Sequence, residues 1–304
     1  MITPPWLKSG DIIGLVAPAS YVKAEDLARF LAILETWELK AIQGKNLFRR
    51  KNSFAGSDEQ RAADFQQMLD DPSIKAILCA RGGYGTFRIV DKLQFTAFRQ
   101  NPKWIVGCSD ITVLHTLMQK NLKTESMHAI MPRHISAGKK DLSSLDSLKN
   151  ALFGNLKEYD LKPDRHNRKG EASGILVGGN LSVLYSMRGT QLDIDTAGKI
   201  LFLEDVGEYL YHIDRMIMNL KISGKLKDLK GLIIGGMSGM KVSVSGFRKT
   251  AYDVIREAVE EYSYPVMFGF PAGHMRPNMT LILGREVILR VGSDECNLVF
   301  RQAR

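Results

Sequence analysis

The sequence predicts an α/β protein with an N-terminal doubly wound parallel sheet and a smaller C-terminal domain of mixed α+β type. Up to about residue 140, apolar strand-like runs alternate with helical patterns across short connections. Repeated βα units of this kind form a parallel sheet covered by helices on both faces. After residue 171 the strand-like runs continue, but fewer helical patterns separate them. The 304 residues are enough for two domains of ordinary size.

The first domain is expected over residues 1–140. Its elements follow from buried apolar runs for strands and from 3.6-residue apolar spacing for helices. Ser57 opens the second helix, because a serine followed by Asp58 and Glu59 is typical of a helix N-terminus. The expected elements, in order, are a strand at 11–20, a helix at 24–37, a helix at 57–69, a strand at 74–79, a glycine turn at 81–85 followed by a helix, a strand at 104–107 and a helix at 111–120.

Residues 141–170 are polar and rich in lysine, so a linker is expected there, followed by the second domain over 171–304. This domain is predicted to contain strands at 171–180, 199–204, 231–235 and 286–290, and helices at 180–187, 209–223 and 246–262.

The composition favours a protein of the cytoplasm that binds neither nucleic acid nor membrane. The net charge is +9, but the basic residues are scattered and lack interleaved aromatic side chains. No apolar run is long enough for a membrane helix, and the start of the chain lacks the pattern of a signal peptide. Cys79, Cys108 and Cys296 have no CxxC spacing, so they are expected to be reduced. No metal motif is present, and no cofactor is expected.

Cys108 and Ser109 lie where an apolar strand meets a small turn and then a helical pattern. Hydrolytic enzymes with α/β folds place nucleophiles at such junctions, because the turn lifts one side chain above the sheet beside free backbone N–H groups. Geometry alone leaves open which of the two residues attacks. Ser182, in a second strand-to-helix turn, is a weaker rival.

A serine nucleophile needs a base and an acid that orients the base. Among the histidines, His274 is the best candidate for the base, because its loop at 269–278 is rich in glycine and proline and follows a strand, but the segment alone also fits a loop histidine without a catalytic role. For the acid, strand alternation sends Glu204 and Asp205 to opposite faces, so only one of them can face a given cleft. Asp205 and Glu208 suit capping of the following helix better. The remaining histidines fit packed or surface positions: His115, His128, His134, His166 and His212.

The turn at 81–85 follows a strand but has neither the lysine of a P-loop nor the GxGxxG spacing. Its backbone N–H groups suit a developing oxyanion better than a phosphate group.

Several motifs, in this order along the chain, resemble the LD-carboxypeptidase family of serine peptidases, which also contains the microcin C self-immunity peptidases. The resemblance covers essentially the whole chain. The motifs are ARGGYG at 80–85, VGCSDIT at 106–112, LVGGNLS at 176–182, LEDVGE at 203–208 with YHIDR at 211–215, and PAGH at 271–274.

The resemblance implies a catalytic triad of Ser109, His274 and Glu204, with oxyanion donors on the backbone of Asp110 and of the Gly82-Gly83 turn. It also implies release of terminal D-alanine from murein tetrapeptides during cytoplasmic cell-wall recycling. The implied fold pairs a flavodoxin-like or amidotransferase-like domain with a smaller swivelling domain, in a homodimer.

Three positions depart from the family pattern: Cys108 replaces a common aromatic residue, 128–132 reads HAIMP in place of His-Gly-Pro, and Met275 replaces a common glycine. These departures leave the exact peptide open. The alternatives are a microcin-type peptidase for aminoacyl nucleotides, a cysteine-dependent amidase that uses Cys108, and a non-catalytic binder of small ligands.

Overall fold

The computed structural model describes residues 1–135, 141–242 and 249–302. The chain folds into two compact units. The first comprises Met1–Leu156 and Pro277–Ile282, and the second comprises Lys157–Arg276 and Leu283–Arg304. In the described part of the chain, every helix is too short or too polar to span a bilayer.

The first unit contains the predicted parallel sheet, in which β2, β1, β3, β4 and β5 are neighbours in that order and β11 lies beside β5. All four pairings among β1 to β5 are parallel. The order 2-1-3-4-5 is that of flavodoxin-like proteins, so the expected fold class is confirmed. The strands are β1 (Ile12–Val16), β2 (Lys40–Gln43), β3 (Ile74–Cys79), β4 (Trp104–Gly107), β5 (Ser126–His128) and β11 (Leu281–Leu283).

The helices of this unit follow the local signals in the sequence. Ser57 caps α2 as expected: its hydroxyl accepts from Gln60 N at 3.2 Å, and Ser57 N donates to the Gln60 side chain at 2.9 Å. After the turn at 81–85, however, the expected helix is replaced by two short 3-10 segments, η1 (Thr86–Arg88) and η2 (Val90–Lys92). The other helices are α1 (Ala24–Thr36), α2 (Asp58–Asp70), α3 (Thr96–Gln100), α4 (Thr112–Leu117) and α5 (Leu142–Leu152).

The prediction of a linker at 141–170 is wrong for the first half of this range. Residues Leu142–Leu152 form α5, which belongs to the first unit. Its buried residues include Leu145, Leu148 and Leu152, so leucine spacing within a polar segment was the signal that this prediction overlooked. The second half contains β6 (Glu158–Leu161), which pairs with β13.

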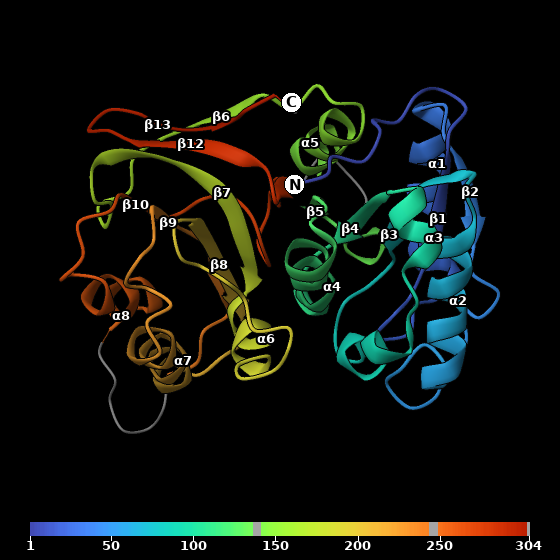
Figure 1. Ribbon diagram of the computed structural model, residues 1–304, viewed down its shortest axis with the longest axis horizontal. Coiled ribbons are helices and arrows are strands. Elements are labelled where there is room, and N and C mark those ends of the chain that lie inside the picture. Colours follow the sequence, from blue (N-terminus) through green and yellow to red (C-terminus); the bar gives the residue numbers. More distant parts are fainter. Residues whose placement is uncertain (136–140, 243–248, 303–304) are drawn as a thin grey trace. The chain divides into compact units, whose positions relative to one another are not determined.

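The second unit is built on a mixed sheet in the order β10-β9-β8-β7-β12-β13-β6 (Figure 1). The pairs β7–β8, β8–β9 and β9–β10 are parallel. The pairs β7–β12, β12–β13 and β13–β6 are antiparallel. The mixed α+β architecture is thus confirmed. Its remaining strands are β7 (Gly170–Asn180), β8 (Ile200–Val206), β9 (Gly231–Ser238), β10 (Val266–Met267), β12 (Glu286–Val291) and β13 (Cys296–Phe300).

Three helices accompany the parallel half of this sheet: α6 (Leu181–Ser186), α7 (Leu210–Ile222) and α8 (Ala251–Ala258). Helix α8 is shorter than the predicted 246–262, and residues 246–248 of that prediction lie outside the described residues. Thr250 is its N-cap, and the Thr250 hydroxyl accepts from Asp253 N. Helices α7 and α8 pack side by side (Figure 1).

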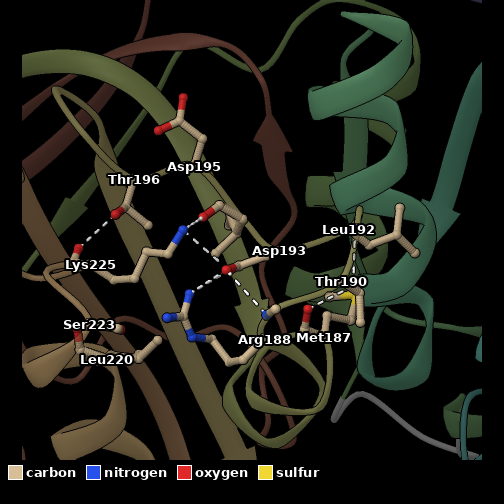
Figure 2. Close-up of polar contacts among 12 residues, drawn as sticks. Met187, Arg188, Thr190, Leu192, Asp193, Asp195, Thr196, Leu220, Ser223 and Lys225 are labelled. Carbon is tan, nitrogen blue, oxygen red and sulfur yellow. Dashed lines mark hydrogen bonds and ion pairs between the residues drawn. The ribbon is translucent and has the colours of Figure 1, made fainter.

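The loop between α6 and β8 carries an ion cluster centred on Asp193. Figure 2 shows Arg188 and Lys225 meeting this carboxylate, at 2.6 Å from Arg188 Nη1 and 3.2 Å from Lys225 Nζ. Arg188 also donates to Asn219 in α7 at 3.2 Å. The cluster ties the loop to the end of α7.

The end of α2 depends on a buried lysine from the segment that leads into β4. Lys103 is 1% exposed, and its ammonium group donates to the carbonyls of Met68, Leu69 and Asp71 at 2.9, 3.0 and 2.6 Å. The last carbonyls of a helix have no partner within the helix. The lysine supplies those partners and fixes α2 against β4.

We predict that Lys103→Met lowers the free energy of unfolding by about 2 to 4 kcal/mol, because it leaves buried carbonyls without donors. Urea denaturation followed by circular dichroism measures the effect. Lys75→Met is the matched control, since Lys75 donates to the Pro72 carbonyl in an exposed setting, and we expect a change within about 0.5 kcal/mol. Equal losses in the two variants would contradict the assigned role of Lys103.

Candidate active site

Ser109 occupies a strained turn directly after β4. The strand ends at Gly107, Cys108 is extended, and Ser109 has a φ of +63° before η3 (Ser109–Ile111) and α4 begin. A left-handed backbone is uncommon for a residue other than glycine, and such strain is concentrated at functional sites. The local geometry is that of the strand-to-helix elbow expected from the sequence.

The elbow separates the two candidate nucleophiles. Cys108 is 1% exposed, and Asn278 Nδ2 lies 3.8 Å from its sulfur. Ser109 is partly exposed. Because the nucleophile must reach a substrate, this geometry favours Ser109 and makes Cys108 part of the core.

The Gly82-Gly83 turn lies against Ser109. A Cβ atom built on Gly82 would be 2.8 Å from Ser109 Cβ and 3.0 Å from Ser109 Oγ. Gly83 has a φ of +103°. Ser20 N donates to the Gly82 carbonyl at 3.2 Å, which ties the turn to the loop after β1. Only glycine permits so close an approach of backbone to the serine.

Two buried charged residues support this turn. Arg61, from α2, donates through Nη1 to the carbonyls of Pro18 and Gly85, the latter at 2.8 Å. The Asp110 side chain accepts from Thr86 N at 2.7 Å, and burial raises the pKa of this carboxyl above its ordinary value. Both residues act on backbone groups, so they fix the loop beside Ser109.

The second unit brings Glu204 and His274 together. Glu204, near the end of β8, is fully buried, and its Oε2 accepts from His274 Nδ1 at 2.8 Å and from His274 N at 3.0 Å. Gly273 makes this contact sterically possible, because a Cβ there would lie 2.5 Å from Glu204 Oε2. The pairing fixes the Nδ1–H tautomer of His274 and leaves Nε2 for proton transfer.

The surroundings of His274 favour its charged form. Burial alone would lower the pKa of His274, but the hydrogen bond to Glu204 and the charges of Glu204 and Asp205 outweigh that effect. The pKa therefore lies above its ordinary value of 6.5. A histidine in this setting is suited to act as a general base near neutral or mildly alkaline pH.

Asp205 does not cap the following helix, so that expectation is wrong. Its Oδ2 accepts from Ser182 N, at the start of the preceding helix α6, at 2.9 Å. Strand alternation also fails to separate it from Glu204, because Asn180 Nδ2 reaches both carboxylates. The pairing of β8 with β9 is irregular between Leu203 and Asp205, which accounts for the departure. Glu208 pairs with His212 in α7 at 2.6 Å.

The other candidates have different surroundings. His115 is buried between Ser126 Oγ and the Gly107 carbonyl, and burial lowers its pKa to about 3. His128 is buried in β5, and His166 lies between Asp164 and Asp253. The Ser182 hydroxyl donates to Asn180 Oδ1, which gives it a structural role. Within the described ranges, no group of three or more His, Cys, Asp or Glu side chains is arranged to hold a metal ion.

Two family models match the chain: the LD-carboxypeptidase N-terminal domain over residues 13–129 and the LD-carboxypeptidase C-terminal domain over residues 173–289. The chain belongs to the LD-carboxypeptidase family of serine peptidases. A "probable murein peptide carboxypeptidase" of Bacillus subtilis is 35% identical over 291 residues, which cover 94% of this chain and 91% of the relative.

Solved LD-carboxypeptidase structures share the fold. The muramoyltetrapeptide carboxypeptidase of Oxalobacter formigenes has a TM-score of 0.84 at 28% identity, over 96% of this chain and 99% of its own. The microcin C7 self-immunity protein MccF, in complex with aspartyl sulfamoyl adenosine, has a TM-score of 0.88 at 20% identity, over 99% of both chains. The assignment to a serine peptidase family removes the support for a cysteine amidase or a non-catalytic binder.

We predict that Gly82→Ala slows labelling of Ser109 by a fluorophosphonate probe by at least about 100-fold, because the new methyl group displaces the Ser109 side chain. Labelling rates and thermal melting measure reactivity and folding separately. Gly174→Ala is the control, since its Cβ would meet no atom closer than 3.4 Å, and it should label normally. Normal labelling of the Gly82 variant would contradict the close approach of this turn to Ser109.

Proposed function

We propose that this LD-carboxypeptidase releases the terminal D-alanine of murein tetrapeptides by hydrolysing the bond between an L-centre and a D-residue. Ser109 is the nucleophile, His274 the general base and Glu204 the acid that orients His274. The observation that carries the proposal is the hydrogen bond from His274 Nδ1 to the fully buried side chain of Glu204. A buried carboxylate that holds a partly exposed imidazole in one tautomer is the acid–base half of a serine-hydrolase triad.

In the proposed reaction, Ser109 Oγ attacks the scissile carbonyl carbon while His274 Nε2 takes the hydroxyl proton. Glu204 stabilises the resulting imidazolium through Nδ1. The tetrahedral intermediate collapses, the C–N bond breaks, and D-alanine leaves with the proton from His274. Water then attacks the acyl-enzyme, its proton goes to His274, and cleavage of the ester bond returns the free hydroxyl of Ser109.

The developing oxyanion is proposed to bind to backbone N–H groups of Asp110 and of the Gly82-Gly83 turn. The contact between Gly82 and Ser109 supports this assignment. So does the strained elbow, since the residue after an elbow nucleophile begins a helical segment with free N–H groups.

Chain connectivity also supports the pairing of Ser109 with His274. Asn278 N donates to Ser144 Oγ at 2.8 Å, and its amide lies beside Cys108. Only three residues lie between His274 and Asn278. An extended chain covers about 3.3 to 3.6 Å per residue, so the base is tethered by a short segment to the residue that precedes the nucleophile.

The choice of a murein peptide rests on the relatives named for that substrate. Cell-wall recycling with this substrate is a reaction of the cytoplasm, which we propose as the location, and a homodimer is the proposed assembly. The relation to MccF makes aminoacyl nucleotides the competing substrate class. Parallel assays with a muropeptide and an aminoacyl sulfamoyl nucleotide separate the two, since preferred hydrolysis of the nucleotide would overturn the murein assignment.

We predict that Ser109→Ala reduces D-alanine release from a purified murein tetrapeptide by at least about 1,000-fold, because no acyl-enzyme forms. Amino-acid analysis of the products measures the release. Cys108→Ser is the matched control at the neighbouring position and should retain most of the activity. Full activity in the alanine variant, or loss of activity only in the Cys108 variant, would reverse the assignment of the nucleophile.

We predict that Glu204→Gln lowers the pKa of His274, because it removes the negative charge and leaves a neutral amide that binds the imidazolium less strongly than a carboxylate does. Titration of ¹⁵N-histidine NMR signals measures the change. In the wild-type protein the pairing contributes stability that is complete below about pH 6.5 and declines as the pH rises through the higher folded-state pKa. The variant should lose this dependence. An unchanged His274 pKa would contradict the assigned pairing.

A further inference from the structure

Asn180 joins the start of α6 to the two buried carboxylates. It is the last residue of β7 and the N-cap of α6. Its amide oxygen accepts from Val183 N at 3.1 Å and from Ser182 Oγ at 2.9 Å. A backbone N–H is an obligatory donor, so the oxygen of the amide must face the helix. The NH₂ end must then point the opposite way, toward β8.

That NH₂ group lies between Glu204 and Asp205. Nδ2 donates to Glu204 Oε1 at 3.2 Å and to Asp205 Oδ1 at 3.1 Å. In the pairing of β7 with β8, Asn180 is directly opposite Glu204. Glu204 Oε1 and Oε2 therefore have different partners: Oε1 accepts from Asn180, and Oε2 accepts from His274.

Asp205 is held as firmly as Glu204. Its side chain accepts from Ser182 N at 2.9 Å and from Val206 N at 2.8 Å, and the residue is 1% exposed. Asp205 thus provides a fixed second acceptor for the Asn180 amide. Two adjacent buried carboxylates repel each other, and a hydrogen-bond donor shared between them lowers the free-energy cost of burying both.

We propose that Asn180 is a positioning residue for catalysis, which holds Glu204 so that Oε2 faces His274, with Asp205 as the anchor for the Asn180 amide. The proposal rests on the proposed function. It assigns a role to the first turn of α6, because formation of this helix sets the orientation of the amide. Asn180 acts through Glu204 and is not required to touch the substrate.

The charges around this cluster make Asn180→Asp an informative variant. Aspartate has nearly the same shape and is a good helix N-cap, but its ionised form has only acceptors. Glu204, Asp205, Glu208 and His274 are the titratable groups whose charges act on the cluster, and Glu208 is itself paired with His212. Burial, together with the charge of Glu204, already raises the pKa of Asp205 to about 6.

A third carboxyl group at this position therefore retains its proton to a higher pH than an ordinary aspartate. While protonated, it donates to one neighbour and partly replaces the asparagine. Once ionised, it repels Glu204 and displaces it from His274. We expect kcat of Asn180→Asp, relative to the wild type, to fall progressively as the pH rises, by about 10- to 100-fold at pH 8.5. KM for the murein tetrapeptide should stay within about twofold.

Two further variants separate positioning from folding. Asn180→Ser retains an N-cap but lacks the amide bridge, so it should lower kcat without the added pH dependence. Asp193→Asn breaks the ion cluster of Figure 2 in the loop that follows α6. It should lower the melting temperature while its kcat and pH profile match the wild type. A loss in Asn180→Asp that is constant across pH, or confined to KM, would overturn the proposal.

A measurement without substrate tests the proposal independently of the proposed function. In selectively ¹⁵N-histidine-labelled protein, the His274 Nδ1 proton bound to Glu204 should give a downfield signal. We expect the signal to persist in Asp193→Asn, to broaden in Asn180→Ser, and to disappear from Asn180→Asp as the pH rises. An unchanged signal in both Asn180 variants would refute the positioning role even if the protein proved inactive on muropeptides. Failure of wild-type D-alanine release, with the expected NMR behaviour, would refute only the proposed substrate reaction.

Discussion

The burial of the Glu204 carboxylate is the constraint on which the acid–base half of the site depends. A fully buried charge is costly unless each oxygen has a donor, and both oxygens here accept hydrogen bonds from Asn180 and His274. Position 273 must be glycine for the same reason, because any side chain there would collide with the Glu204 carboxylate. The raised pKa of His274 is a further consequence. The burial of Glu204 thus accounts for the glycine at 273, the orientation of the Asn180 amide and the raised pKa of His274.

The surroundings of Ser109, the proposed nucleophile, are built by backbone geometry, and buried charged side chains support them. Ser109 is held at a left-handed φ by the turn from β4 into η3, and Gly82 packs against it without a side chain. Arg61 binds the carbonyl of Gly85, and Asp110 accepts from the N–H of Thr86 directly after this turn. Such an arrangement leaves the serine hydroxyl accessible while fixing the N–H groups beside it.

The sequence predicts the structure best where the signal for a feature lies within that feature's own segment. The parallel sheet, the elbow at Ser109, the cap at Ser57 and the loop of His274 each follow from periodicity, composition or motif order. The short strands β5 and β10 carry too few residues for a period to show, and the edge strand β2 is only half buried. The roles of Lys103, Arg61 and Asn180 depend on carbonyls or carboxylates supplied by other elements. No pattern within their own segments contains that information.

Asp205 shows why a carboxylate pair is difficult to interpret from sequence. Alternation along an ideal strand separates neighbours onto opposite faces, but the irregular pairing of β8 with β9 and the reach of Asn180 bring both carboxylates to one amide. A residue that resembled a helix cap therefore supports Glu204, the proposed catalytic acid. The same geometry explains why two acidic residues lie side by side in the interior. Asp205 holds the Asn180 amide in place, and the Asn180 amide in turn holds Glu204. Neutralising Asp205 would thus act on His274 in two ways, by loosening the Asn180 amide that holds Glu204 and by removing a charge that raises the pKa of His274.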